Sequence, residues 1–171
     1  KVFVPRQKEL ERHYTEGELL QREVLKKLVK RAADTEYGRN HTFSTIKGYD
    51  NFAHNVPVNT YEELKADIDR MRHGERDILW PGKVKWYAKS SGTTNDKSKF
   101  IPVSEEGLQN IHYQGGTDCV ALYLRNYEKS RLFDGRALIL GGSHSPNYNI
   151  HNSLVGDLSA ILIENINPLV N

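Results

Sequence analysis

The chain has 171 residues, of which 37% are hydrophobic and 27% are charged, and that length is sufficient for one globular domain with its own core. Its 24 basic and 22 acidic residues leave a formal net charge of +2, so charge gives no reason to expect a nucleic-acid or membrane surface. The one cysteine, Cys119, excludes an internal disulfide and a thiolate metal site, and it fits a reducing, cytoplasmic location.

The first part of the chain, residues 1–78, carries mainly helical patterns. We expect one helix over about residues 5–13, and a second that begins at a capping box formed by Thr15 and Glu18. Apolar residues then recur at helical spacing, and Gly38 is the expected stop. These two helices predict a packing layer with a charged outer face.

Residues 39–59 are predicted to be irregular, because polar and turn-forming residues interrupt the apolar repeat. His41 and His54 lie in this stretch, and neither has a second ligand at metal spacing. No protein metal site is therefore expected here.

A further helix is predicted after a second capping box, formed by Thr60 and Glu63 and closed by Gly74. Its apolar face is expected to consist of Tyr61, Leu64, Ile68 and Met71. This helix would end shortly before the pattern changes from helical to alternating.

Two short strands are predicted over residues 83–89 and 100–103. In the first, Val84, Trp86 and Ala88 alternate with polar or charged residues, which predicts a strand with one buried face. In the second, Pro102 cannot donate a backbone hydrogen bond, so we expect an edge strand or a strand end. The segment 87–103 thus places a loop between two strands.

That loop concentrates hydroxyl groups beside a glycine. Its core consists of Ser90, Ser91, Gly92, Thr93 and Thr94, and Lys97 and Lys99 follow. Hydroxyls, backbone N–H groups around a glycine and a nearby ammonium together suit a polyphosphate. The alternative is a solvated surface turn, which has the same ordinary composition. The loop does not match the G-x-x-x-x-G-K-[ST] pattern of P-loop enzymes.

The remaining elements continue an α/β pattern. Ser104 is the expected cap of a helix from Glu105 to about Tyr127, with a kink or a close approach at Gly115-Gly116. The apolar run 137–140 predicts a buried strand. After it, Ser143 and His144 are candidates for lining a substrate pocket, because ligands bind at the carboxyl ends of strands in open α/β sheets. Residues 154–165 are expected to form a helix or a covering segment.

The loop sequence SSGTTNDKSK resembles the first ATP-binding motif of the adenylate-forming superfamily. Within it, the sequence is most similar to the Gretchen Hagen family of acyl-acid amido synthetases, the auxin-responsive proteins of plants and their bacterial relatives. Lys99 stands at the tenth position of the motif, as in that family. Asn95-Asp96 replace residues that are more often glycine in plant members, which we interpret as a bacterial-type variant. The stretches FIPVS, GRALILGGSHSP and GDLSAILIENINP extend the likeness beyond the loop.

The resemblance implies a fold and an extent. It implies an α/β architecture in which residues 1–78 form a helical layer and residues 79–171 form the first α/β part, with the phosphate loop at 87–103, of one larger adenylate-forming domain. We expect the chain to be an N-terminal fragment that is inactive by itself. The residues that hold adenine, ribose and magnesium are then expected beyond residue 171.

The resemblance also implies an activity that uses ATP and Mg²⁺. A carboxylic acid would be adenylated and then joined to an amino acid or another amine. Thr93 and Lys99 would be catalytic, and the ATP phosphates would be held by Ser90, Ser91, Gly92, Thr93, Thr94 and Lys99. The expected partners are these small substrates, without nucleic acid or membrane. An acyl-CoA ligase and a non-catalytic binding module stay open as alternatives.

Overall fold

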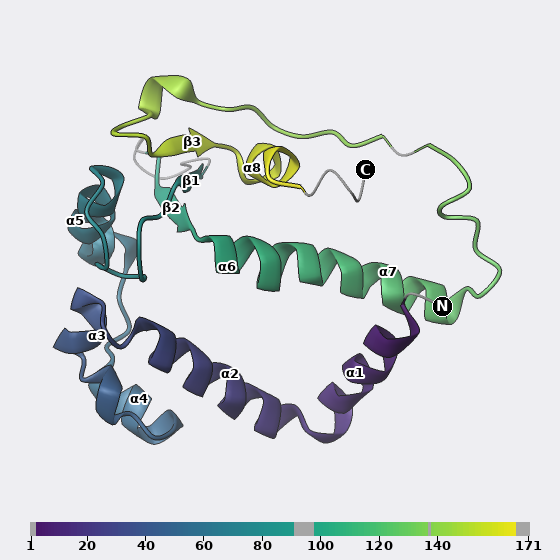
Figure 1. Cartoon of the computed structure of the whole chain (residues 1–171), viewed down its shortest axis with the longest axis horizontal. Helices are drawn as coiled ribbons and strands as arrows, with labels where there is room; N and C mark the ends of the chain where they lie inside the picture. The colour runs from purple at the N-terminus through teal and green to yellow at the C-terminus, as the bar shows by residue number, and fades with distance from the viewer. Residues whose placement is uncertain (1–2, 91–97, 137, 167–171) are drawn as a thin grey trace.

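A small mixed sheet and the helices around it make up the computed structural model, which describes residues 3–90, 98–136 and 138–166 (Figure 1). The helices and helical turns are α1 (Val4–Thr15), α2 (Gly17–Ala32), α3 (Glu36–Asn40), η1 (Phe43–Thr45), α4 (Tyr49–Asn55), α5 (Tyr61–Arg72), α6 (Glu105–Gly107), η2 (Leu108–Tyr113), α7 (Gln114–Asn126), η3 (Pro146–Tyr148) and α8 (Leu158–Glu164). The strands are β1 (Trp86–Lys89), β2 (Phe100–Val103) and β3 (Leu154–Gly156). The predicted α/β class is confirmed. Within the described residues, no helix is both long and apolar enough to span a membrane.

The first two helices form as expected, but the predicted capping box between them is wrong. Helix α1 continues through Thr15, and Glu16 occupies the position before α2 without a side-chain cap. Glu18 accepts a hydrogen bond from Arg22 at 2.6 Å instead of reaching back along the chain. Because Thr15 is the last residue of α1, its backbone is helical and it does not take the extended conformation of an N-cap.

Helices α1 and α7 contact each other although they are far apart in sequence. Figure 1 shows α1 beside the far end of α7. Arg6 donates two hydrogen bonds to the carboxylate of Asp118, at 2.5 and 2.8 Å, and Gln7 donates to the carbonyl of Ala121 at 2.9 Å. The Arg6 guanidinium holds the pKa of Asp118 below its ordinary value.

The segment predicted to be irregular contains short helices, so that prediction is wrong. Helix α2 ends at Ala32, before the expected stop at Gly38. The hydroxyl of Thr35 donates to the carbonyl of Ala32 at 2.7 Å and accepts from the N–H of Gly38 at 2.9 Å, so one side chain serves both helix ends. Phe43 of η1 is buried against α2, with Phe52 of α4 packed beside it. Burial of these aromatic rings supplies a driving force that local polarity does not reveal.

The predicted helix after Thr60 is confirmed as α5. The carboxylate of Glu63 accepts hydrogen bonds from the backbone N–H of Thr60 at 2.6 Å and from its hydroxyl at 2.8 Å, so the capping box is formed. The bonds lower the pKa of Glu63. After the helix, Gly74 has φ +97°, a left-handed conformation that favours glycine.

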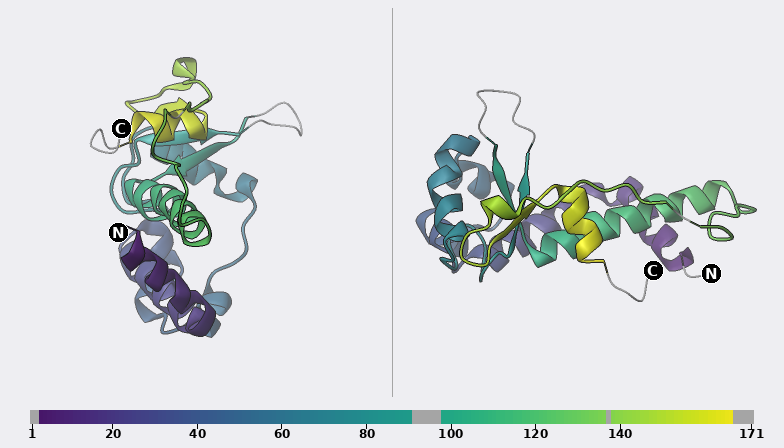
Figure 2. Two further views of the ribbon diagram at one scale, coloured as in Figure 1. Left: turned by 90° about the vertical axis from the view of Figure 1, so that its right-hand side faces the viewer. Right: turned by 90° about the horizontal axis from the view of Figure 1, so that it is seen from above.

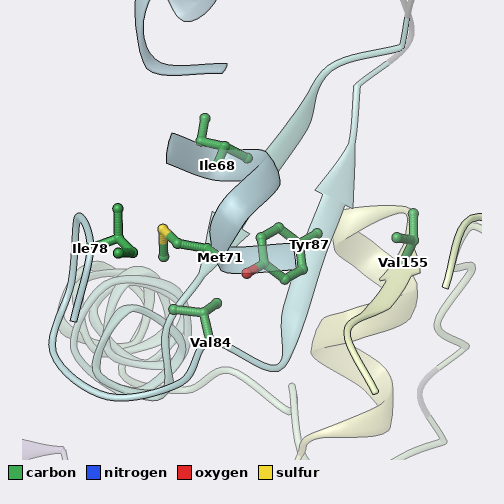
Figure 3. Close-up of a cluster of buried hydrophobic side chains, with 6 residues drawn as sticks. All are labelled: Ile68, Met71, Ile78, Val84, Tyr87 and Val155. Carbon is green, nitrogen blue, oxygen red and sulfur yellow. The ribbon is translucent and has the colours of Figure 1, made fainter. Parts of the chain in front are cut away.

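In the residues that the structure describes, the sheet has three strands in the order β2-β1-β3, and β1 is central. It pairs antiparallel with β2 and parallel with β3, so β2 is an edge, as Pro102 predicted. The expected single buried face of β1 is wrong, because Tyr87, assigned to the solvent side, is 0% exposed. Two clusters cover the two faces: Tyr87 packs with residues of α5 and β3 (Figure 3), whereas Trp86 packs with Val103, Leu108 and Ile161.

The helix predicted from Glu105 is confirmed in its extent but differs in its interior. Ser104 caps it by accepting from the N–H of Gly107 at 3.0 Å. The irregular turn is the π-helical segment η2, and Gly115-Gly116 lie inside the regular helix α7. A Cβ placed at either glycine would meet nothing within 4 Å, so neither the kink nor the close approach is found there.

The predicted buried strand at 137–140 is wrong. Ala137 lies outside the described residues, and Leu138, Ile139 and Leu140 are 85%, 64% and 86% exposed on backbone that pairs with no strand of the described sheet. The third strand lies instead at the start of the segment 154–165, as β3, and the predicted helix follows it as α8. A three-residue strand carries too short a pattern to be distinguished from the helix next to it.

Candidate functional site

The hairpin formed by β1 and β2 brings the two ends of the predicted phosphate loop together. Lys89 is paired with Phe100, and the backbone N–H of Ser90 donates to the carbonyl of Lys99 at 2.9 Å. Ser90 is half-buried and Lys99 is exposed. The other predicted phosphate-binding residues, Ser91, Gly92, Thr93 and Thr94, lie outside the described residues. The structure therefore describes the base of the loop, where the predicted lysine is next to the first predicted serine.

Lys99 is associated with the beginning of α5. Its ammonium nitrogen lies 5.4 Å from the centre of the Tyr61 ring. The hydroxyl of the same tyrosine accepts a hydrogen bond from the N–H of Phe100 at 3.0 Å. Since Tyr61 is the first residue of α5 and directly follows the N-cap Thr60, a well-defined helix start positions the aromatic ring on which the lysine lies.

A second group of side chains at the loop base was not predicted from the sequence. The ammonium of Lys89 lies 4.1 Å from the centre of the Tyr148 ring, and that ring packs on Phe100 at 5.7 Å between centres. Arg72 also lies on Phe100, with its guanidinium carbon 3.8 Å from the centre of the Phe100 ring. The alternation of the strand could have indicated the position of Lys89. Lys89 and Tyr87 are two residues apart and hence lie on one face of β1, which the structure places against α5.

Arg72 fixes this group to the body of the protein. Its side chain is nearly buried, and it donates to the carbonyl of Tyr148 at 2.9 Å and to Asp69 at 3.5 Å. Within the described residues, its Nε atom and the hydroxyl of Tyr87 are buried without a hydrogen-bond partner. Burial raises the pKa of Tyr87 to about 12, against the opposing effects of the nearby Ser153 hydroxyl and the Arg72 charge.

Ser143 and His144 lie at the same end of the sheet as Ser90. They are placed there by contacts with β3 and not, as predicted, by a strand at 137–140. Strand β3 is parallel to β1, and His144 bridges to Gly156, the last residue of β3. The N–H of Ser143 donates to the carboxylate of Asp157 at 2.9 Å. Both predicted residues are exposed. Their role in a substrate pocket stays a prediction.

A small cavity of about 220 Å³ lies at the opposite end of β1 from the loop. It is lined in part by Trp80, Lys85, Trp86 and Glu105. Because the strand separates it from Ser90, it is distinct from the predicted phosphate site. In the parts of the chain that the structure describes, no three metal-ligating side chains gather into a cluster.

The sequence and the fold both match known proteins. A family model described as "GH3 family N-terminal domain" matches residues 6–168. The chain belongs to the GH3 family. Indole-3-acetic acid-amido synthetase GH3.6 of Arabidopsis thaliana is 33% identical over 95 residues, which cover 55% of this chain and 16% of that enzyme. Jasmonoyl–L-amino acid synthetase JAR6 of Nicotiana attenuata is 30% identical over 92 residues, covering 53% of this chain and 16% of that protein.

The solved structure of GH3.15 acyl acid amido synthetase superposes with a TM-score of 0.78 at 27% identity. The match covers 93% of this chain and 28% of the GH3.15 chain. The mixed α/β architecture described above is thus that of a part of a GH3 structure. The chain spans less than a third of the length of these relatives, two of which are named as amido synthetases and one as an amino acid synthetase.

Proposed function

We propose that the full-length protein is an ATP-dependent acyl-acid amido synthetase. The observation that carries this proposal is the family match over residues 6–168, because the similar proteins named above are amido synthetases. The geometry of the hairpin supports it: adjacent strands hold Ser90 and Lys99 together at the two ends of the hydroxyl-rich loop.

The proposed reaction has two steps. An oxygen of the substrate carboxylate attacks the α-phosphorus of ATP. The bond between this phosphorus and the oxygen that bridges it to the β-phosphorus breaks, and pyrophosphate leaves with the negative charge. The amine nitrogen of the second substrate then attacks the acyl carbon, AMP leaves, and the nitrogen loses a proton to give the amide. The substrate carboxylate is the nucleophile, so no protein side chain needs to serve as one.

The loop's part in this scheme is electrostatic. The hydroxyls of Ser90, Ser91, Thr93 and Thr94, the N–H groups around Gly92 and the ammonium of Lys99 would hold the phosphates and stabilise the charge that builds on pyrophosphate as it leaves. Donors positioned in advance are effective because they need no reorganisation during the reaction. Anchoring of the loop base by β1, β2 and Tyr61 is consistent with such positioning.

The described residues around the loop base suit a polyphosphate in their charge. Arg72, Lys89 and Lys99 all lie there on aromatic rings. Mg²⁺ would share the charge of the phosphates.

The test is carboxylate-dependent exchange of pyrophosphate into ATP, measured on the full-length protein with aromatic, indolic and fatty acids. We expect acid-dependent exchange in the wild type. In Thr93→Ala and Lys99→Ala the rate should fall about 10²–10³-fold, the usual effect of removing one such donor. Lys30→Ala is the matched control, because Lys30 is exposed on α2 and α2 lies away from the sheet (Figure 1).

Different outcomes distinguish the proposal from its alternatives. Exchange followed by consumption of coenzyme A, and no amide product with any amino acid, would identify an acyl-CoA ligase. Folded protein that neither exchanges nor binds ATP would indicate a non-catalytic binding module. Wild-type rates in both Thr93→Ala and Lys99→Ala would remove the loop from the mechanism. We further propose a bacterial-type member on the basis of Asn95-Asp96; the similar proteins named above are from plants.

A further inference from the structure

Two lysines stand at the base of the loop, and each ammonium lies on a tyrosine ring. Lys89 is the last residue of β1 and Lys99 directly precedes β2. Lys89 lies on Tyr148 and Lys99 lies on Tyr61. The two views of Figure 2 show β1 and β2 side by side, so the two lysines are carried by adjacent strand ends.

The ring under Lys89 is held from two directions. Its neighbour Phe100 is the residue paired with Lys89 across the hairpin, and the two rings are 5.7 Å apart. Arg72 of α5 donates to the backbone carbonyl of Tyr148 at 2.9 Å and also lies on Phe100. Tyr148 is therefore fixed to the loop base although 59 positions of sequence separate it from Lys89.

An aromatic ring orients an ammonium without neutralising it, whereas a carboxylate partner would cancel the charge. Among residues 3–90, 98–136 and 138–166, neither Lys89 nor Lys99 has a carboxylate within ion-pair distance. Lys89 is half-buried, so its interaction with an anion is less weakened by water than that of an exposed lysine.

A second cation, Arg72, packs in the same group of rings. The guanidinium of Arg72 lies on Phe100, and the Phe100 ring packs on the ring that carries Lys89. Two like charges gathered around one pair of rings repel each other, and a bound polyanion would relieve that repulsion. The exposed carboxylate of Asp69 is the acidic partner of Arg72, at 3.5 Å.

We propose that Lys89 is a second cationic ligand of the ATP polyphosphate, opposite Lys99, and that Tyr148 is the positioning residue that holds it. This inference rests on the proposed function, because it assigns a further binding residue to the same ATP site. Lys89 contributes charge, and Tyr148 contributes only the ring on which the charge is held.

The test compares four variants of the full-length protein. Lys89→Met removes the charge, Tyr148→Leu removes the ring, and Tyr148→Phe keeps the ring. Lys85→Met is the matched control, because its ammonium also lies on a ring, 5.4 Å from the centre of Trp86, but at the other end of β1. The steady-state constants for ATP and for the acid are measured separately in pyrophosphate exchange, and unfolding is followed for every variant.

We expect Lys89→Met and Tyr148→Leu to raise the KM for ATP about ten- to a hundredfold, the range of one hydrogen bond to a charged group, with little change in the KM for the acid. Tyr148→Phe should retain most of the affinity, and Lys85→Met should match the wild type. Binding of magnesium pyrophosphate, measured by calorimetry, should weaken in Lys89→Met and depend less on salt concentration, because one ionic contact has been removed.

The inference and the proposed function fail in different ways. Acid-dependent exchange in the wild type, together with an unchanged KM for ATP in Lys89→Met, overturns the inference and leaves the proposed function intact. A Tyr148→Phe variant as impaired as Tyr148→Leu overturns the positioning role of the ring. Absence of exchange contradicts the proposed function, and the titration with magnesium pyrophosphate then tests whether Lys89 binds phosphates. Wild-type affinity in Lys89→Met, or no binding of pyrophosphate at all, overturns the assignment of Lys89.

Discussion

Replacing Tyr87 by phenylalanine should stabilise the protein, although Tyr87 is among the most deeply buried residues. Its side chain is 0% exposed and contacts the cluster made by α5, β1 and β3 (Figure 3). Among the described residues its hydroxyl makes no hydrogen bond of good geometry, although the Ser153 hydroxyl, which donates to the carbonyl of Arg72, lies nearby. A buried polar group without a partner costs about 1–3 kcal/mol of desolvation. Tyr87→Phe removes that cost and keeps the ring, so we expect a gain of about 1–2 kcal/mol.

A second tyrosine provides the matched control. The hydroxyl of Tyr113 donates to the carbonyl of Leu162 at 2.8 Å, so Tyr113→Phe removes a formed hydrogen bond. That change should destabilise the protein by about 1 kcal/mol. The same chemical substitution is therefore predicted to have opposite signs at two buried or partly buried sites.

The assay is chemical denaturation of the full-length variants, combined with hydrogen exchange of the β1 and β3 amides, which reports local stability where unfolding is not two-state. The pH dependence of stability is an independent test of this prediction. Burial raises the pKa of Tyr87 from 10.0 to about 12, so between these values the folded state holds a proton that the unfolded state has lost. Wild-type stability then falls as pH rises from 10 to 12, and Tyr87→Phe lacks this part of the fall.

Destabilisation by Tyr87→Phe at neutral pH would refute the reasoning. It would mean that the hydroxyl has a partner in solution; the oxygen of the nearby Ser153 hydroxyl is the first candidate, and a buried water shared with the Nε atom of Arg72 is the second.

Two further predictions concern helix ends and helix packing. Gly38→Ala should be strongly destabilising in thermal unfolding, because the added Cβ would overlap with the carbonyl oxygen of Ala32. Gly116→Ala should instead stabilise α7 by about 0.5–1 kcal/mol, because its Cβ meets nothing within 4 Å. Equal effects at the two sites would contradict this prediction. Asp118→Asn should loosen α1 from α7, seen as faster hydrogen exchange in α1, and the wild type should show the same loosening as pH falls through the lowered pKa of Asp118, because protonation removes the charge that Arg6 binds. If exchange in α1 is the same in Asp118→Asn as in the wild type, the ion pair does not dock the helix.

Local signals in the sequence were sufficient for much of the fold. The capping box at Thr60, the serine cap at Ser104 and the apolar periods between them depend on neighbours three or four residues away. Pro102 indicated an edge strand because a residue without an N–H group disfavours a central position. The resemblance carried by the SSGTTNDKSK loop led to the family that the match over residues 6–168 shows.

Where a local signal competed with a distant contact, the distant contact prevailed. The end of α2 was decided by another local contact: the helix ends before Gly38 because the Thr35 hydroxyl, three residues from both Ala32 and Gly38, bridges two helix ends. The apolar run around Ile139 predicted a buried strand, but burial requires a neighbouring element, and the described sheet places β3 beside β1 instead. Run length and hydrophobicity do not specify which strands will pair.

At the loop base, some residues could be predicted from the sequence and others only from the tertiary structure. Composition predicted a phosphate-binding loop, because hydroxyls, a glycine and lysines in one short loop have a shared chemistry, and the family resemblance then singled out Lys99 among its lysines. The grouping of Arg72, Lys89 and Tyr148 around Phe100 arises only when α5, the hairpin and η3 pack together. Cation–aromatic contacts between residues far apart in sequence have no periodic signature, so only the tertiary structure determines them.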